Sequence, residues 1–404
     1  MNPRTVLSGV LAFIVVSGLA WSAAPESDAG AKRQIVVFQD SVVNLPAQDA
    51  LVKAVGGVVV KPLRLINGMA VMLPAPAVAA LARRAEVKRV DEDLVISATD
   101  SAASAAPAPP VTASKGKPTP TPTPTPPPVP PQEVPWGVVR VGAPYAWTYS
   151  TGSWVKVAVL DTGVQLNHPD LQGNVAGGVN TINSAKSADD DNGHGTHVAG
   201  IVAAINNTRG VVGVAPAAKI YAVKALDRNG RGWLSDLIEG LNWCIDNHMQ
   251  VVNMSLGATS DNQSFHEAIT KVFQSGITQV AAAGNESSGQ VNFPAGYEEV
   301  ICVTASDIGD QFASFSNYGS AVDLIAPGVA IESTYKGGAY RELSGTSMAT
   351  PHVTAIAALR LQLHPSEGPA AIKSVLQGNT VSLGLPPEKQ GAGLPLAILV
   401  VTAP

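Results

Sequence analysis

One serine in the last third of the chain has a sequence context that suits nucleophilic chemistry. Ser347 lies in Gly345-Thr-Ser-Met-Ala-Thr-Pro351, and an apolar, alanine-rich run from Met348 to Leu363 follows it. The run predicts a buried helix, which places the Ser347 hydroxyl at a helix N-terminus. Free N–H groups and the positive end of the helix dipole there favour the negative charge that develops in acyl transfer. A serine before a helix is more often only an N-cap, so other residues must decide between the two interpretations.

Three further polar side chains occupy comparable positions in the sequence: Asp161 after the apolar run Val155–Leu160, His194 at the start of the helical stretch His194–Ile205, and Asn285 after Ile277–Ala283. Together with Ser347 they provide an orienting acid, a general base, an oxyanion donor and a nucleophile. The types and the spacing therefore indicate acyl-transfer chemistry, provided that the fold brings all four together.

The elements that must position them alternate between strand and helix. Apolar strand-like runs are found at Val155–Leu160, Ile220–Val223, Val251–Leu256, Ile277–Ala283 and Val300–Thr304, and helix-like stretches at His194–Ile205, Trp233–Asn247, Gln263–Gln274 and Met348–Leu363. Strands that are apolar on both faces and alternate with helices predict an α/β fold with a doubly wound, mostly parallel sheet covered on both sides. Ligands of such folds bind outside the carboxyl ends of the strands, where these polar residues lie.

Four segments resemble the subtilisin family of serine proteases: Val159-Leu-Asp-Thr-Gly163, His194-Gly-Thr-His-Val-Ala-Gly200, Ala281-Ala-Ala-Gly-Asn285 and Gly345-Thr-Ser-Met-Ala-Thr-Pro351. Their order of acid, base and serine is the order of that family. The resemblance covers residues 132–401 and implies a serine endopeptidase. In this interpretation Ser347 attacks the peptide carbonyl, His194 takes and returns its proton, and Asp161 orients the imidazole ring. Asn285 and the Ser347 N–H would bind the oxyanion.

The resemblance also implies substrate-binding residues. The segments that line the primary specificity pocket of that family correspond here to Ser255, Leu256 and Gly257, and to Ala282, Ala283 and Gly284. The family's strand that pairs with the substrate backbone corresponds to Gly230 and Gly232. Strand pairing reads side chains only at alternate positions, so we expect broad specificity. Ordinary turns are the alternative explanation of these glycines. The segment between Asn285 and Val300 is shorter than in the best-known subtilisins, which leaves the preferred side chain open.

A structural calcium site is implied in the same way, with the ligands Gln132, Asp170, Ile205, Asn207, Arg209 and Val211. Carboxylate, amide and carbonyl oxygens suit this hard cation. Without the resemblance, Asn206-Asn207 would be interpreted as a turn. The acidic run Asp189-Asp190-Asp191 could form a second cation site, but a solvated loop is the preferred interpretation. His197 has no His-Glu-x-x-His motif around it and is expected to be a structural helix histidine.

The N-terminal third predicts a processed precursor with four parts. Arg4, the apolar run from Val6 to Ala20 and the small residues before Ala24 are typical of a secretory signal peptide, residues 1–24; a membrane anchor is the less favoured alternative. Residues 25–99 form a predicted α+β propeptide, residues 100–131 a Pro/Thr/Ala-rich linker, and residues 132–404 the catalytic domain.

The first of the two domains resembles the subtilisin propeptide through Ile35-Val-Val-Phe38 and Val90-Asp-Glu-Asp-Leu-Val95. The resemblance implies an intramolecular chaperone and temporary inhibitor whose tail lies in the active site. From its alignment we expect the enzyme to cut its own chain after Thr99, within a few residues.

Composition limits the remaining possibilities. The 404 residues are 46% hydrophobic and 14% charged with a net charge of -5, which argues against a nucleic-acid partner. No organic cofactor and no stable membrane association of the secreted product are expected, and a monomer is the default. The two cysteines, Cys244 and Cys302, are expected to be buried free thiols rather than a disulfide. Two other functions stay open: a catalytically silent protease-like binding protein, and an esterase that uses the same triad.

Overall fold

The computed structural model describes residues 30–99 and 131–404. The predicted signal peptide, 1–24, and all of the predicted linker except Pro131 lie outside the described residues. None of the helices within the described ranges combines the length and apolar character that a membrane crossing requires.

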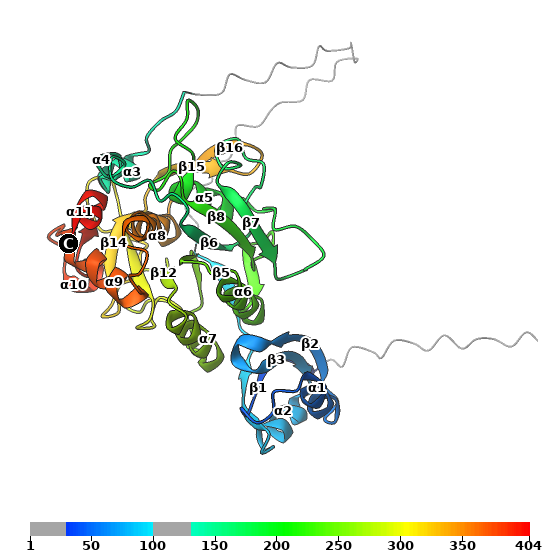
Figure 1. Ribbon diagram of the computed structural model, residues 1–404. Coiled ribbons are helices and arrows are strands. Elements are labelled where there is room, and N and C mark those ends of the chain that lie inside the picture. Colours follow the sequence, from blue (N-terminus) through cyan, green and yellow to red (C-terminus); the bar gives the residue numbers. More distant parts are fainter. Residues whose placement is uncertain (1–29, 100–130) are drawn as a thin grey trace, which may run out of the picture.

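A seven-stranded sheet forms the centre of the larger unit, in the order β14-β13-β12-β10-β6-β8-β7 (Figure 1). Its strands are β6 (Lys156–Asp161), β7 (Val175–Asn180), β8 (Lys219–Lys224), β10 (Val251–Met254), β12 (Thr278–Ala282), β13 (Ile301–Ser306) and β14 (Leu324–Pro327). All six pairings between neighbouring strands are parallel. The predicted doubly wound parallel sheet is therefore confirmed.

Helices cover both faces of this sheet because interior strands such as β6 are apolar on both sides. Val157 and Val159 of β6 belong to a core that includes α5 (His194–Ala203) and α8 (Thr346–Leu363). The alternate residues Ala158 and Leu160 belong to a second core with α6 (Leu234–Asp246) and α7 (Gln263–Gln274). The period of two along a strand separates the side chains into these two layers.

Strand β6 also marks the place where the sheet topology changes direction. Its neighbours are β8 on one side and β10 on the other, so the later strands extend the sheet in both directions from it. A crevice for ligands is expected outside the carboxyl end of such a strand. Asp161 is the last residue of β6 and lies at this end.

Smaller elements complete this unit: α3 (Trp136–Arg140), α4 (Ala143–Ala146), β15 (Ile331–Tyr335), β16 (Ala339–Leu343), α9 (Pro369–Gly378), β17 (Thr380–Val381), α10 (Pro387–Gln390), β18 (Leu394–Pro395) and α11 (Ala397–Thr402). The apolar C-terminal run packs into the core through Val400 and Val401. Cys244 and Cys302 are buried and free, as expected, and burial raises the pKa of both thiols.

The N-terminal unit is an antiparallel sheet of the order β2-β3-β1-β4 with two helices. Its elements are β1 (Lys32–Phe38), α1 (Leu45–Lys53), β2 (Val58–Leu63), the 3₁₀ turn η1 (Arg64–Ile66), β3 (Gly68–Leu73), α2 (Ala75–Ala82) and β4 (Val87–Glu92). Val36 and Phe38 pack beneath its own helices, whereas Ile35 and Val37 join the core that contains α6 and α7. One face of this sheet is therefore buried against the larger unit.

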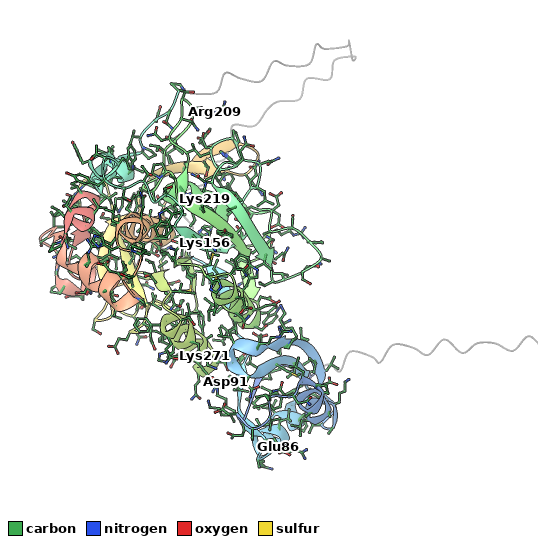
Figure 2. All side chains as sticks on the ribbon, in the orientation of Figure 1. Glu86, Asp91, Lys156, Arg209, Lys219 and Lys271 are labelled. Carbon is green, nitrogen blue, oxygen red and sulfur yellow. The ribbon has the colours of Figure 1, made fainter. Side chains whose placement is uncertain are left out.

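Polar contacts border that buried face. The Ser264 hydroxyl at the start of α7 donates to Asp91 over 2.6 Å, and the Lys271 ammonium donates to the carbonyl of Leu65 over 2.7 Å. Figure 2 shows Asp91 and Lys271 near each other where the blue unit meets α7.

Candidate active site

The acid and the imidazole meet at the carboxyl end of β6. His194 Nδ1 lies 2.7 Å from Asp161 Oδ1, and the Thr162 N–H donates to the same oxygen over 2.7 Å. The Asp161 side chain is fully buried, and His194 is almost so. Burial raises the pKa of Asp161, and the charge of His194 together with its hydrogen bond acts against that rise. The pair thus satisfies the geometric condition for a ring oriented by a carboxylate.

Helix α5 presents His194 from its first turn, and a second carboxylate holds that turn. Asp190 Oδ1 accepts the N–H of Gly193 and the hydroxyl of Thr162, both over 2.9 Å. Asp190 Oδ2 accepts the N–H of Thr196 over 3.0 Å. Asp190 is only 7% exposed, so the expectation of a solvated loop is wrong for this residue. A buried carboxylate needs such donors, and N-terminal helix N–H groups supply them.

Close approach of α5 to the end of β6 requires glycine at position 195. A Cβ atom on Gly195 would lie 2.1 Å from the carbonyl oxygen of Gly163, which is shorter than any contact that carbon and oxygen tolerate. The glycine after His194 therefore lets the helix start directly against the strand that carries Asp161.

Asn285 is held at the start of α8 by Thr346, the residue before Ser347. The Asn285 Oδ1 atom accepts both the N–H and the hydroxyl of Thr346, each over 2.9 Å. Because the oxygen is held by two donors, the Asn285 Nδ2 group is directed toward the cleft. Sequence reasoning missed the role of Thr346, although it stands beside Ser347 in the motif.

The cleft contains a strand from the N-terminal unit. Strand β5 (Val95–Ala98) lies between β9 (Arg231–Trp233) and β11 (Leu256–Gly257), antiparallel to both. The next residue, Thr99, is buried, and its carbonyl oxygen accepts Asn285 Nδ2 over 2.6 Å. Ser347 Oγ lies 2.5 Å from the same oxygen and 2.6 Å from Thr99 Oγ1. A backbone carbonyl of this chain is thus held between the candidate nucleophile and the candidate oxyanion donor.

The residues expected to bind substrate surround this strand. Ile96 pairs with Gly232, and the Ala98 N–H donates to the carbonyl of Gly230 over 2.9 Å. On the other side Ser97 pairs with Gly257, and Ala98 pairs with Leu256. The carbonyl of Ser255 accepts the Thr99 N–H over 3.3 Å, and Ala282, Ala283 and Gly284 are buried beside this edge.

Asn292 restricts the space next to Gly257. A Cβ atom added at Gly257 would lie 3.0 Å from the Cβ of Asn292, and Asn292 Nδ2 donates to Glu286 over about 3.2 Å. A cavity of about 320 Å³ is lined in part by Val95, Gly257, Glu286 and Asn292. The segment between Asn285 and Val300 therefore contributes two polar side chains, Glu286 and Asn292, to the lining of this cavity.

The six residues expected to hold calcium lie together. Gln132 Nε2 donates to the carbonyls of Ile205 and Val211 over 2.8 and 3.3 Å, and Gln132 Oε1 accepts the Asn207 N–H. Asp170 accepts Asn207 Nδ2 over 2.9 Å and the Val211 N–H over 3.0 Å. The Arg209 N–H donates to Asn207 Oδ1 over 2.7 Å.

This arrangement fits a hard cation. Two carbonyl oxygens converge on one amide nitrogen, and a half-turn of the Gln132 amide would present its oxygen at the same place. Among residues 30–99 and 131–404, no three His, Cys, Asp or Glu side chains gather closely enough to hold a metal ion. A cation bound here would depend mainly on amide and carbonyl oxygens.

His197 lies on α5 one turn after His194, but its ring contacts the β15–β16 hairpin. Its Nε2 atom lies 3.0 Å from the carbonyl of Ile331 and 2.8 Å from that of Arg341, both in the β15–β16 hairpin. The expected structural role of this histidine agrees with these contacts.

Comparisons with known proteins agree with this geometry. A family model described as "Subtilase family" matches residues 152–393. Subtilisin BL of Lederbergia lenta is 48% identical over 254 residues, which is 63% of this chain and 93% of that protein. An alkaline protease of Shouchella clausii is 48% identical over 254 residues, 63% of this chain and 66% of that protein.

One relative extends further toward the N-terminus. Subtilisin amylosacchariticus of Bacillus subtilis subsp. amylosacchariticus is 39% identical over 361 residues, 87% of this chain and 86% of that protein. A match of this length cannot be contained in the part of the chain that follows Gln132, so it includes much of the N-terminal unit.

Proposed function

Because the chain belongs to the subtilase family and is a subtilisin-type serine endopeptidase, we propose that Asp161, His194 and Ser347 are its catalytic triad. Asn285 and the Ser347 N–H form the oxyanion hole. Ser347 Oγ attacks the substrate carbonyl carbon while its proton passes to His194, and Asn285 stabilises the oxyanion. The carbon–nitrogen bond then breaks as His194 gives the proton to the leaving amine. A water molecule, activated in the same way, releases the acyl group from Ser347.

The position of Thr99 carries this proposal. Its carbonyl oxygen lies between Asn285 Nδ2 and Ser347 Oγ at 2.6 and 2.5 Å, while β5 pairs with the two strands expected to bind substrate. This is how a substrate residue on the amino side of a scissile bond would be held. The chain thus supplies its own first substrate, with the bond after Thr99 as the site of self-cleavage.

The proposed organisation of the precursor follows from that cut. Residues 1–24 direct export, 25–99 form the propeptide, 100–131 are a linker, and 132–404 form the catalytic domain. After cleavage the propeptide stays bound as an inhibitor, because β5 fills the strand position that a substrate needs. The mature enzyme acts outside the cell on protein substrates. Calcium, held by the Gln132 and Asp170 set, would stabilise the fold without entering the chemistry.

The substrate pocket favours small side chains before the cut. Thr99 is the side chain that the zymogen places there, and Asn292 narrows the wall beside Gly257. Replacement of Asn292 by glycine is therefore expected to shift the cleavage preference toward larger residues.

Three measurements test the proposal as a whole. A fluorophosphonate should label the wild-type chain and leave Ser347→Ala unlabelled, and N-terminal sequencing of the processed product should begin at Asp100. Casein should be hydrolysed far better than a short-chain ester. Equal labelling of the Ser347→Ala chain would refute the assigned nucleophile, and a product that begins beyond Gln132 would refute the cleavage site.

A further inference from the structure

A buried lysine stands beside the catalytic acid in the sheet. Lys224, the last residue of β8, pairs in register with Asp161, the last residue of β6. Only 5% of Lys224 is exposed. We propose that Lys224 is a positioning residue of the active site, whose ammonium group joins the chain segments that carry Asp161, His194 and the substrate-pairing strand β9. The inference rests on the roles proposed above for Asp161 and His194.

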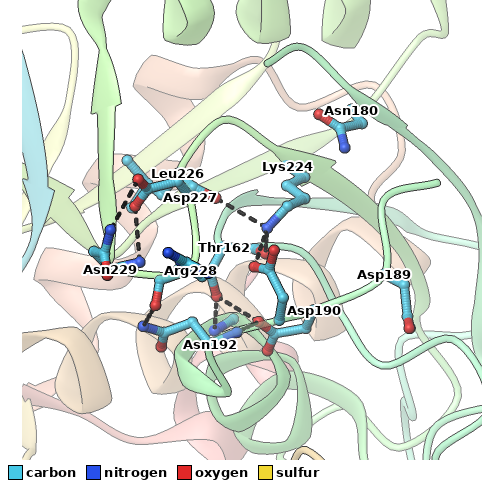
Figure 3. Close-up of polar contacts among 12 residues, drawn as sticks. Thr162, Asn180, Asp189, Asp190, Asn192, Lys224, Leu226, Asp227, Arg228 and Asn229 are labelled. Carbon is cyan, nitrogen blue, oxygen red and sulfur yellow. Dashed lines mark hydrogen bonds and ion pairs between the residues drawn. The ribbon is translucent and has the colours of Figure 1, made fainter. Parts of the chain in front are cut away.

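The ammonium group has three acceptors for its three protons. It donates to the carbonyl of Thr162 over 2.5 Å, to the carbonyl of Leu226 over 3.1 Å and to Asp191 Oδ1 over 2.7 Å. Figure 3 shows the amine of Lys224 directed toward Thr162 and Leu226. A buried ammonium whose donors are all satisfied in this way is fixed in one position.

The first acceptor is the carbonyl of Thr162, the residue that follows the proposed catalytic acid. Thr162 also donates its hydroxyl to Asp190 and accepts the Gly195 N–H over 2.9 Å. Its backbone is therefore held by Lys224 while its side chain is held at the start of α5. A shift of the Thr162 peptide would move the Asp161 carboxylate relative to the His194 ring.

The second acceptor belongs to the segment that leads into β9. The N–H groups of Ala225 and Leu226 both donate to the Asp161 carbonyl over 3.0 Å, while the Leu226 carbonyl accepts from Lys224. This segment continues through the turn at Asp227 to Gly230, whose carbonyl accepts the Ala98 N–H. Lys224 thereby connects the acid to the edge of the substrate strand.

The third acceptor lies in the loop before His194. The Asp191 side chain is 56% exposed, so its ion pair with Lys224 is screened by solvent and contributes little. The two buried backbone carbonyls provide most of the restraint. Removal of the ammonium would leave both without a partner near a site where small displacements are costly, since an error of about 1 Å can reduce the rate about 100-fold.

The test compares two identical substitutions on one strand. Lys224→Met keeps the length and apolar stem of the side chain but removes the donors. Lys219→Met, at the opposite end of β8, is the matched control; the Lys219 ammonium donates to the carbonyl of Gly173 and to Asn174 Oδ1. Asp191→Asn removes only the exposed partner. Activity is measured on the self-processed chains with a peptide amide substrate.

We expect Lys224→Met to lower kcat by about 10- to 100-fold with KM changed less than about threefold. Lys219→Met and Asp191→Asn should stay within about threefold of wild type. In the uncleaved Ser347→Ala background, where the chain stays intact, Lys224→Met should shift or broaden the low-field proton resonance of the His194–Asp161 hydrogen bond. Lys219→Met should leave that resonance unchanged. The melting temperature of each variant, measured in the same background, shows that the chain is folded.

The inference fails if folded Lys224→Met retains wild-type kcat and an unchanged resonance. It also fails if Lys219→Met loses activity equally, because the effect would then reflect general stability. If the wild-type chain has no activity that depends on Ser347, the proposed triad fails instead. The two failures are therefore distinguishable.

Discussion

The orientation of one amide decides whether the cleft can stabilise an oxyanion. The Asn285 side chain could present either its oxygen or its nitrogen to a substrate carbonyl. The backbone and hydroxyl of Thr346 both donate to Oδ1, so the nitrogen is left to meet the carbonyl of Thr99. Thr346, the neighbour of the proposed nucleophile, would thus contribute without touching the substrate.

Replacement of Thr346 by valine tests this arrangement. Thr346→Val keeps the shape but removes one of two donors to Asn285, so kcat should fall about 3- to 10-fold with little change in KM. Thr346→Ser retains the hydroxyl and is expected to keep most of the activity. Steady-state kinetics on a peptide amide measure kcat and KM of both variants. An equal loss of kcat in Thr346→Val and Thr346→Ser would contradict the proposed orientation of the amide.

His352 gives stability a dependence on pH. It is fully buried in α8, and burial lowers its pKa from 6.5 to about 4. Between these values the unfolded chain binds a proton that the folded chain does not bind. The contribution of His352 to stability is therefore complete above about pH 6.5 and is lost as the pH falls toward 4, by about 3 kcal/mol in total.

Replacement of His352 by asparagine removes this proton uptake. The comparison uses the Ser347→Ala chain, which cannot digest itself, with and without His352→Asn. The difference in free energy of unfolding between these two chains should narrow as the pH falls from 6.5 to 4. Denaturant unfolding at several pH values measures it. A difference that stays constant over this range would contradict the assignment.

At the scale of the elements, the N-terminal unit is attached to the larger unit by one apolar sheet face with charged contacts around it. Strand β1 contributes Ile35 and Val37 to the core shared with α6 and α7. Lys61 of β2 reaches Asp236 and Glu239 on α6 over 2.5 and 2.8 Å, and also the carbonyl of Thr181 over 2.6 Å. The Asp236 side chain is only 5% exposed. Loss of the Lys61 ammonium would therefore leave a nearly buried carboxylate without this positive charge beside it.

Lys61→Met should therefore weaken the hold of the cleaved propeptide by about 10- to 100-fold. In the full chain this change shortens the delay between self-cleavage, followed on gels, and the appearance of activity. Lys53→Met provides the control, because Lys53 is exposed and pairs with Asp49 within the propeptide. An unchanged delay in Lys61→Met would show that the apolar face alone determines release.

Across the whole molecule, the cleft is assembled from segments that are far apart in the chain. Asp161 and His194 come from β6 and α5, Ser347 from α8, and the bound strand from the N-terminal unit. The loop 205–211 joins Gln132 and Asp170, and the Tyr340 hydroxyl of β16 also donates to Asp170 over 2.8 Å. A cation at Gln132 and Asp170 would thus link three parts of the catalytic domain.

Calcium should accordingly raise the stability of the whole domain. At about 100 times its dissociation constant, a bound cation adds about 3 kcal/mol and raises the melting temperature by roughly 5 to 10 °C. Asp170→Asn in the Ser347→Ala background should lose most of this response, whereas Asp189→Asn should retain it. Thermal unfolding with calcium and with a chelator measures both, and a calcium response that persists in Asp170→Asn would place the ion elsewhere.

The strands that sequence analysis found and those that it missed differ in their surroundings. The interior strands are recognisable in the sequence as continuous apolar runs, because helices cover both faces of the sheet. The two edge strands of the large sheet, β7 and β14, were missed: β7 contains Gly177 and Gly178, and β14 ends in Pro327. Glycine and proline are poor strand signals, and only pairing with β8 and β13 makes these segments strands.

The sequence by itself determined the family resemblance, the alternating α/β pattern and the four polar residues at strand ends and helix starts, since motifs and hydrophobic period are local properties. It also predicted the cut after Thr99, which awaits protein sequencing. Tertiary structure alone decided that the buried Asp190 carboxylate accepts N–H groups at the start of α5, that Thr346 orients the Asn285 amide, and that Lys224 lies beside Asp161. Burial and hydrogen-bond partners depend on residues distant in the chain, and no local pattern contains them.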